Sequence, residues 1–167
     1  MSLPRITFLG ILAGATIWCG LILAAPLLAH TDSPVASPLY DGFHRVCHQF
    51  EDRSLHLAGM PLPVCARCSA IYFSFLLGVL AYPVFRRLTQ PRIPPRAVVI
   101  AAVIPMVADV GFGMIGVYDV SMSTRLVTGA LFGSGIAFVI LPVAIEAANQ
   151  ILRPSHITKM PKGLTDA

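Results

Sequence analysis

Long apolar runs alternate with short polar connections along this chain. Four of the runs are long, and they are Ile6–Ala29, Ser69–Phe85, Ala97–Val117 and Leu126–Leu152. Each is close to the ~20 residues that an α-helix needs to cross a ~30 Å hydrocarbon core. The second run is the shortest, so we expect part of Cys65–Cys68 to complete it. The pattern predicts an all-α integral membrane protein with four transmembrane helices.

The composition agrees with this fold class. Hydrophobic residues make up 56% of the chain, charged residues 12%, and the mean hydropathy is +0.76. Charged residues approach about 25% in soluble domains, so a soluble fold is excluded. The first run is longer than the core of a secretory signal, and we expect it to be retained as a helix. No nucleotide-binding loop, nucleic-acid module or repeat is visible, and the connections are too short for a second core. We expect one membrane domain over residues 1–167, with no nucleic-acid partner.

Lysine and arginine are distributed unevenly between the two sides of the predicted bundle. Eight lie on the side of both termini, namely Arg5, Arg86, Arg87, Arg92, Arg96, Arg153, Lys159 and Lys162. Four lie on the other side, namely Arg45, Arg53, Arg67 and Arg125. Short loops rich in lysine and arginine stay in the cytoplasm. We therefore expect a multi-pass protein of the cell membrane with both termini cytoplasmic, which places the loop 30–68 in the oxidising exoplasmic or periplasmic space.

The loop 30–68 contains a helical pattern followed by an extended one. Leu39, Phe43, Val46, Cys47 and Phe50 recur at helical spacing, which predicts a short amphipathic helix lying on the bundle. On that helix His44, Cys47 and His48 would share one flank. Gly59 is expected to end the helix, and Pro61 and Pro63 to carry the chain in an extended form to the second membrane helix.

Three of the four cysteines, Cys47, Cys65 and Cys68, lie in this loop. Cys65 and Cys68 flank a helix start, where the helix dipole favours thiolate over thiol. Zinc binds about four thiolate or imidazole ligands in a tetrahedron. Cys47, His48, Cys65 and Cys68 therefore form a candidate site for zinc or another transition metal, with His44 or His56 as substitutes for His48.

Two other interpretations of the cysteines remain open. A Cys-x2-Cys pair at a helix start also suits thiol–disulfide exchange, as in four-helix membrane oxidoreductases that pass electrons to quinones. A structural disulfide, joining Cys65 to Cys68 or Cys47 to either, would staple the loop to the bundle. The histidines alone carry less weight, because a loop histidine is commonly only solvated.

The third predicted membrane helix contains an aspartate, Asp109. A carboxylate in the hydrocarbon costs roughly 2.5–3.5 kcal/mol on insertion scales, so it is expected to face the bundle interior. Arg125 opens the fourth helix at the same end, and we expect the two to pair as the floor of a pocket below the cysteine loop. Arg67, between two cysteines, is placed to meet an anionic substrate. Small residues would permit the close helix packing that this needs, namely Gly129, Gly133 and Gly135. Alternatively, Asp109 only joins helices through main-chain groups loosened by Pro105.

The chain also resembles a family of small predicted prokaryotic membrane proteins known only as a domain of unknown function. The residues that carry the likeness are Cys47-His48-Gln49, Arg53-Ser54, Gly59, Pro63-x-Cys65-x-Arg67-Cys68, Tyr72, Pro105, Asp109, Arg125 and Thr128-Gly129-Ala130. The likeness covers roughly residues 40 to 135. This chain departs from the family pattern in having Asp109-Val-Gly111, where aspartate and glycine usually adjoin, and Ser69-Ala70, where Thr-Gly is usual. The resemblance implies a membrane protein and no settled activity.

Three classes of function remain. A metal-dependent membrane protein, either an enzyme or a metal handler, would use the cysteine–histidine cluster, with Asp109, Arg125 and Arg67 as candidate catalytic residues. A thiol oxidoreductase would use Cys65 and Cys68. A small transporter would use Asp109 and Arg125 as gates, and with only four helices it would need to form a homo-oligomer. The lipid bilayer is the expected partner in each case, and the sequence names no small-molecule substrate.

Overall fold

The computed structural model describes residues 2–88, 94–117 and 119–152. The elements are, in order, α1 (Leu3–His30), α2 (Ala36–His44), the 3-10 helix η1 (Glu51–Arg53), β1 (Ser54–Leu57), β2 (Met60–Cys65), α3 (Ala66–Phe85), α4 (Arg96–Met114) and α5 (Met122–Leu152). The four predicted membrane helices are confirmed as α1, α3, α4 and α5, each of which is long and apolar enough to span a bilayer. Large apolar side chains such as Ile17, Leu77 and Val107 are exposed on their surfaces, as lipid-facing residues are. Of the charges used for orientation, Arg92, Arg153, Lys159 and Lys162 lie outside the described residues.

The ends of α4 and α5 differ from the prediction by a few residues. Helix α4 ends at Met114 because Gly116 adopts a φ of +72°, and the Val117 N–H then donates to the Phe112 carbonyl at 3.0 Å. This is the glycine-terminated helix end. Helix α5 begins at Met122, four residues early, because the Ser121 hydroxyl accepts the Thr124 N–H at 3.2 Å and caps it.

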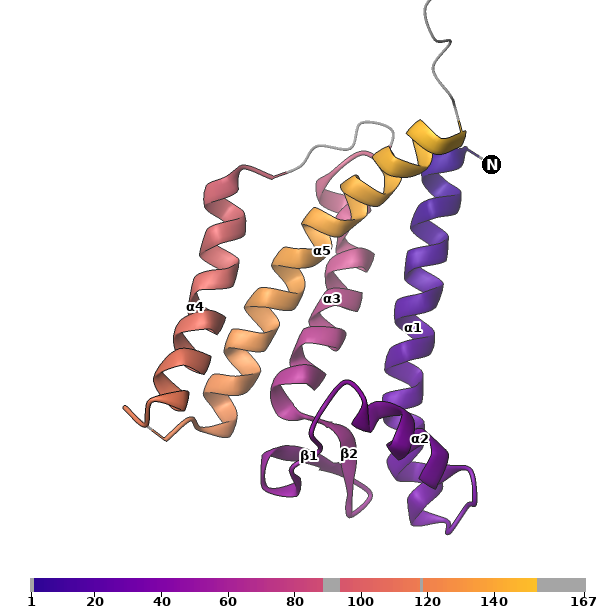
Figure 1. The fold of residues 1–167 in the computed structure, drawn as a ribbon. Coiled ribbons are helices and arrows are strands. Elements are labelled where there is room, and N and C mark those ends of the chain that lie inside the picture. The colour runs from indigo at the N-terminus through magenta and orange to yellow at the C-terminus, as the bar shows by residue number, and fades with distance from the viewer. Residues whose placement is uncertain (1, 89–93, 118, 153–167) are drawn as a thin grey trace, which may run out of the picture.

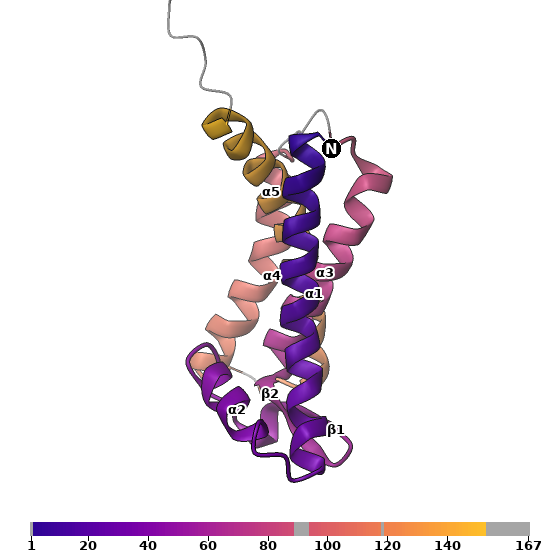
Figure 2. The ribbon, with the colours of Figure 1, turned by 90° about the vertical axis from the view of Figure 1, so that its right-hand side faces the viewer.

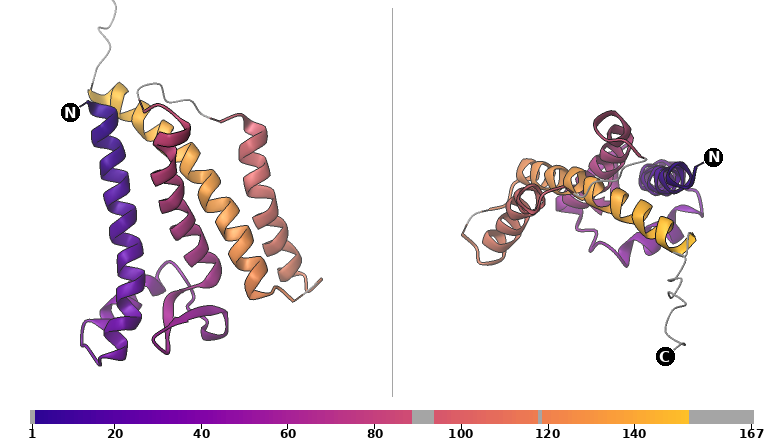
Figure 3. Two further views of the ribbon diagram at one scale, coloured as in Figure 1. Left: turned by 180° about the vertical axis from the view of Figure 1, so that it is seen from behind. Right: turned by 90° about the horizontal axis from the view of Figure 1, so that it is seen from above.

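The membrane helices lie in the order α1, α3, α5, α4 across the bundle, so that α1 and α4 are at opposite sides (Figures 1 and 3). Helices α3 and α5 form the closest pair, and α4 packs on α5 while hardly touching α3. A Cβ atom at Gly129 would lie only 2.6 Å from the Arg67 carbonyl oxygen of α3, and Gly133 also faces α3, whereas Gly135 faces Ala102 of α4. The expectation that these glycines permit close helix approach is confirmed.

The two ends of the bundle have different contents. The start of α1 and the end of α5 lie together, while α2 and both strands lie at the opposite end (Figure 2). The start of α3, the end of α4 and the start of α5 also lie at this second end, which we call the cysteine end. Its exoplasmic location remains a prediction from the charge distribution.

The prediction that the short helix of the loop runs through Phe50 is wrong, because the helix ends earlier. Helix α2 begins at Ala36 and ends at His44, so Cys47 and His48 are not on a helical flank. Gln49 has a φ of +52°, which a continuing α-helix cannot accommodate. Its side-chain amide instead donates to the Tyr40 carbonyl at 2.6 Å and the Pro63 carbonyl at 2.9 Å. These two hydrogen bonds hold the chain after α2 against β2.

A β-hairpin follows, which the sequence interpretation missed. Strands β1 and β2 are antiparallel, with Leu57 opposite Met60 and Ser54 opposite Cys65. Ala58 and Gly59 form the two-residue turn with φ of +53° and +80°, as a type I′ turn requires. Gly59 therefore turns a hairpin rather than ending a helix, and the hairpin delivers Cys65 to the start of α3.

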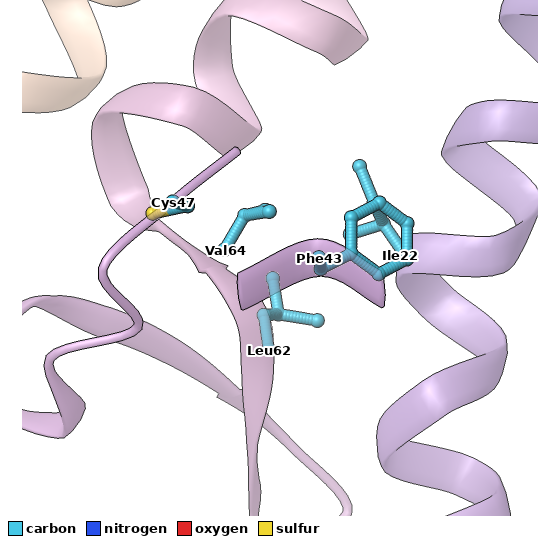
Figure 4. Close-up of a cluster of buried hydrophobic side chains, with 5 residues drawn as sticks. All are labelled: Ile22, Phe43, Cys47, Leu62 and Val64. Carbon is cyan, nitrogen blue, oxygen red and sulfur yellow. The ribbon is translucent and has the colours of Figure 1, made fainter. Parts of the chain in front are cut away.

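A small apolar core lies between the hairpin, α2 and α1. It consists of Ile22, Phe43, Cys47, Leu62 and Val64, all of them buried (Figure 4). Burial of such side chains contributes roughly 1.5–3 kcal/mol each. In the view of Figure 4, Cys47 lies on the far side of Val64 from Phe43 and Ile22. The core thus fixes Cys47 beside the residues that begin α3.

Candidate metal centre and the adjoining polar cavity

Three cysteines converge at the cysteine end. The Sγ atoms of Cys47, Cys65 and Cys68 all lie within 4.8 Å of one another. None of the three is in a disulfide, and Cys47 is buried while the other two are half-buried. The fourth cysteine, Cys19, is buried in α1 outside this group, where its thiol donates to the Tyr72 carbonyl at 3.5 Å. The group therefore offers three converging sulfur ligands.

The start of α3 stabilises the thiolate of Cys65, which is the N-cap residue of that helix. The pKa of Cys65 is lowered to about 5, chiefly by a hydrogen bond with the Cys68 side chain. Burial opposes this shift, and hydrogen bonds from the Cys68 and Arg67 N–H groups and from the Cys47 side chain reinforce it. Cys65 is thus expected to be a thiolate at neutral pH, which is the form that binds metals and attacks disulfides.

Cys47 reaches the group from the segment between α2 and η1. Its Sγ atom accepts the main-chain N–H of Cys65 at 3.2 Å, which links that segment directly to the end of β2. The neighbouring Gln49 provides the two hydrogen bonds to Tyr40 and Pro63 described above. Gln49 is a positioning residue that the sequence interpretation missed, and its adjacency to the cysteine and histidine was the available signal.

The histidines do not join the sulfur group. His48 is exposed and stacks on Phe50, with ring centroids 6.0 Å apart. His44 and His56 are exposed as well. No histidine of the described residues completes a cluster with the cysteines. Of the four metal ligands predicted from the sequence, the structure therefore brings together the three cysteines but not His48.

The buried aspartate of α4 has a different partner from the one expected. Asp109 is 4% exposed, and its Oδ2 forms an ion pair with Nη2 of Arg67 on α3. The Thr128 hydroxyl of α5 also lies 3.3 Å from this oxygen. Among the described residues, Arg125 forms no ion pair with Asp109, and its Nε donates to the Val120 carbonyl at 3.4 Å. The expected Asp109–Arg125 pair is replaced because the first turn of α3 places Arg67 next to α4.

A cavity of about 460 Å³ opens beside this ion pair. Three arginines and three aspartates line it together with apolar residues, and they are Asp52, Arg53, Arg67, Asp109, Asp119 and Arg125. The three candidate catalytic residues Arg67, Asp109 and Arg125 thus share one cavity. None of the cysteines lines it, but Arg67 follows two positions after Cys65 and adjoins Cys68, so the sulfur group and the cavity are neighbours.

Comparison with known proteins gives a family and no activity. The family model described as Predicted membrane protein (DUF2085) matches residues 47–139, which include the three converging cysteines, Asp109 and Arg125. The uncharacterized protein MJ1492 of Methanocaldococcus jannaschii is 36% identical over 108 residues, which are 65% of this chain and 69% of that protein. No solved structure matches the chain significantly. The chain therefore belongs to the DUF2085 family of predicted membrane proteins.

Proposed function

We propose that this membrane protein binds one transition metal, preferably zinc, through Cys47, Cys65 and Cys68. The convergence of the three Sγ atoms within 4.8 Å is the observation that carries the proposal. Three thiolates on a tetrahedral zinc lie ~3.8 Å apart, since the Zn–S distance is ~2.3 Å, so only small side-chain adjustments are needed. The thiolate character of Cys65 suits the same role, because the metal ligand is the thiolate.

Three protein ligands leave one coordination position open, which is typical of catalytic rather than structural zinc sites. A zinc ion held in this way supplies Lewis acidity. We therefore favour a metal-dependent membrane enzyme or a metal handler over a purely structural site. In the enzyme, Arg67, Asp109 and Arg125 would bind and orient the substrate from the adjoining cavity. A metal also protects these thiolates from oxidation in the exoplasmic space that the charge distribution predicts for them.

Metal content of the purified protein tests this proposal. We expect near one metal per chain in the parent and close to none in Cys47→Ser, Cys65→Ser and Cys68→Ser. Cys19→Ser is the matched control and should keep the metal, because Cys19 lies outside the sulfur group. His48→Ala should also keep it, whereas loss of metal in this variant would show a four-ligand structural site. A metal-free parent with a Cys65–Cys68 disulfide would overturn the proposal.

A second candidate, thiol–disulfide exchange, is favoured by the lowered pKa of Cys65. In that reaction the Cys65 and Cys68 thiols give up two electrons and two protons as they form a disulfide, and a quinone or a partner disulfide takes them up. Reduction of the isolated protein's disulfide by a quinol or a thiol partner, without bound metal, would support this candidate. The transporter alternative stays a prediction.

A further inference from the structure

The polar cavity lies outside the sulfur group, and the metal proposal alone does not explain its charges. Its volume of about 460 Å³ suits a small molecule or a lipid headgroup, because ligand sites in proteins commonly measure ~300–1,000 Å³. It is lined by η1, the start of α3, the last turns of α4, the α4–α5 connection and the start of α5. All of these segments belong to the cysteine end.

The three arginines and three aspartates among the described lining residues balance in charge, and four of these six residues already form ion pairs. Arg67 and Asp109 form the buried ion pair, and Arg53 and Asp52 form an exposed one at 3.4 Å. The other two charged residues, Arg125 and Asp119, have no ion-pair partner among the described residues. Arg125 is half-buried and, within the described parts of the chain, donates a hydrogen bond only through its Nε, while Asp119 is exposed. The cavity therefore presents one available cation and one available anion.

The cavity lies close to the ends of the three membrane helices that line it. Asp109 lies five residues before the end of α4, which corresponds to ~7.5 Å at 1.5 Å per residue. Arg67 is the second residue of α3, and Arg125 is the fourth residue of α5. All three residues thus lie within about 7.5 Å of a helix end at the cysteine end, which is within reach of a lipid headgroup at that face of the bilayer.

We infer that the cavity binds a phosphoethanolamine group, with the phosphate on Arg125 and the primary amine on Asp119. Arginine binds phosphate oxygens through two parallel hydrogen bonds, which fits the terminal nitrogens of Arg125. A primary ammonium donates up to three hydrogen bonds, and Asp119 offers a carboxylate to accept them. A neutral zwitterion suits a cavity of zero net charge better than a simple anion, because the aspartates would repel the anion. The group belongs either to a phosphatidylethanolamine lipid or to a water-soluble compound.

The test uses the full-length protein in nanodiscs of phosphatidylcholine. In one arm phosphatidylethanolamine is mixed into the bilayer, and lipid retained by the protein is measured by native mass spectrometry. In the other arm soluble O-phosphoethanolamine is titrated, and its binding is measured by calorimetry. The parent should bind the ethanolamine form in one arm at least, roughly tenfold more tightly than the choline form, which corresponds to about 1.4 kcal/mol. Binding confined to the first arm identifies a lipid, and binding in the second identifies a soluble compound.

Variants locate the binding. Arg125→Gln and Asp119→Asn should each weaken it roughly tenfold, whereas Arg45→Gln, at the same end but outside the cavity, should not. Metal content should be unchanged in all three, because none of these side chains belongs to the group of three cysteines that would hold the metal, and this separates the present inference from the metal proposal. Equal binding of ethanolamine and choline forms, no binding in either arm, or unweakened binding by both cavity variants would overturn the inference.

Discussion

The buried ion pair between Arg67 and Asp109 allows us to predict how substitutions of these residues change the free energy of unfolding. The Asp109 side chain is 3% exposed and that of Arg67 is 15% exposed, so each charge depends on the other for compensation. Removing one member of a buried pair costs about 3–5 kcal/mol, because the remaining charge is left without a partner. Since Arg67 keeps some exposure, we expect Asp109→Leu to lower the free energy of unfolding by about 3 kcal/mol. Asp109→Asn should cost less, because an amide still accepts a hydrogen bond.

The double variant separates the ion pair from simple loss of packing. Replacing both members by apolar residues of similar volume is often neutral, so Arg67→Met combined with Asp109→Leu should be more stable than Asp109→Leu alone. Arg125→Met is the control for removing an arginine from the same cavity, and it should cost less than about 1 kcal/mol because Arg125 has no ion-pair partner among the described residues. Reversible unfolding in mixed micelles measures these differences. If Asp109→Leu is as stable as the parent, or if the double variant is the least stable, the buried ion pair does not compensate the two charges as argued.

Four further predictions concern other parts of the molecule. A cysteine placed at Ser33 should react with an impermeant thiol reagent on intact cells, and one placed at Thr89, which lies outside the described residues, should not; the reverse pattern would put the cysteine end in the cytosol. Gly129→Ala should destabilise the protein, because its Cβ would lie 2.6 Å from the Arg67 carbonyl, whereas Gly10→Ala, with nothing within 4 Å, should not; equal thermal stability of the two variants would contradict this packing. Gln49→Ala should cost about 1–3 kcal/mol by removing two hydrogen bonds, while Gln150→Ala, which removes one exposed bond to Glu146, should cost little in the same unfolding assay. In metal-free protein, alkylation of Cys65 should persist down to pH values near its pKa of about 5 and fall below that, and this lowered pKa stabilises the fold at neutral pH and ceases to do so as the pH drops through 5; a midpoint near 8.5, the ordinary thiol value, would refute the hydrogen-bonded thiolate.

The membrane helices could be predicted closely because one signal decides them. In lipid, an apolar segment such as Ile6–Ala29 can satisfy the hydrogen bonds of its main chain only by forming a helix. Its length and apolarity therefore suffice to predict a membrane helix. The ends were less predictable. Gly116 and Ser121 determine where α4 ends and α5 begins, and capping of this kind depends on local geometry that an apolar run does not reveal.

The cysteine loop shows why local spacing has limits. Cys65 and Cys68 come together because Cys68 follows three positions after Cys65 at one helix start, and the sequence alone indicates this. Cys47 joins them only through tertiary contacts, including the hydrogen bonds of Gln49, and the pattern that suggested a helix through Phe50 misplaced His48.

The ion pair of Asp109 illustrates a second limit. Arg67 and Arg125 both lie at the cysteine end of the sequence-predicted bundle, and nothing in their spacing ranks one above the other as a partner. The choice depends on how closely α3 approaches α5, which Gly129 permits, and on the turn of α3 that faces α4. The ion-pair partner of Asp109 thus depends on how the helices pack, and the sequence of a single segment does not reveal it.

Arg67 interacts with two neighbouring sites at once, the sulfur group and the polar cavity. Its main-chain N–H helps to keep the pKa of Cys65 low, and its side chain forms the ion pair with Asp109 beside the cavity. A shift of the first turn of α3 would therefore affect both the sulfur group and the cavity. Thermodynamic linkage requires that if occupancy of the sulfur group alters affinity in the cavity, occupancy of the cavity alters affinity at the sulfur group by the same factor. Arg67, in the first turn of α3, is the residue through which such reciprocal coupling would act.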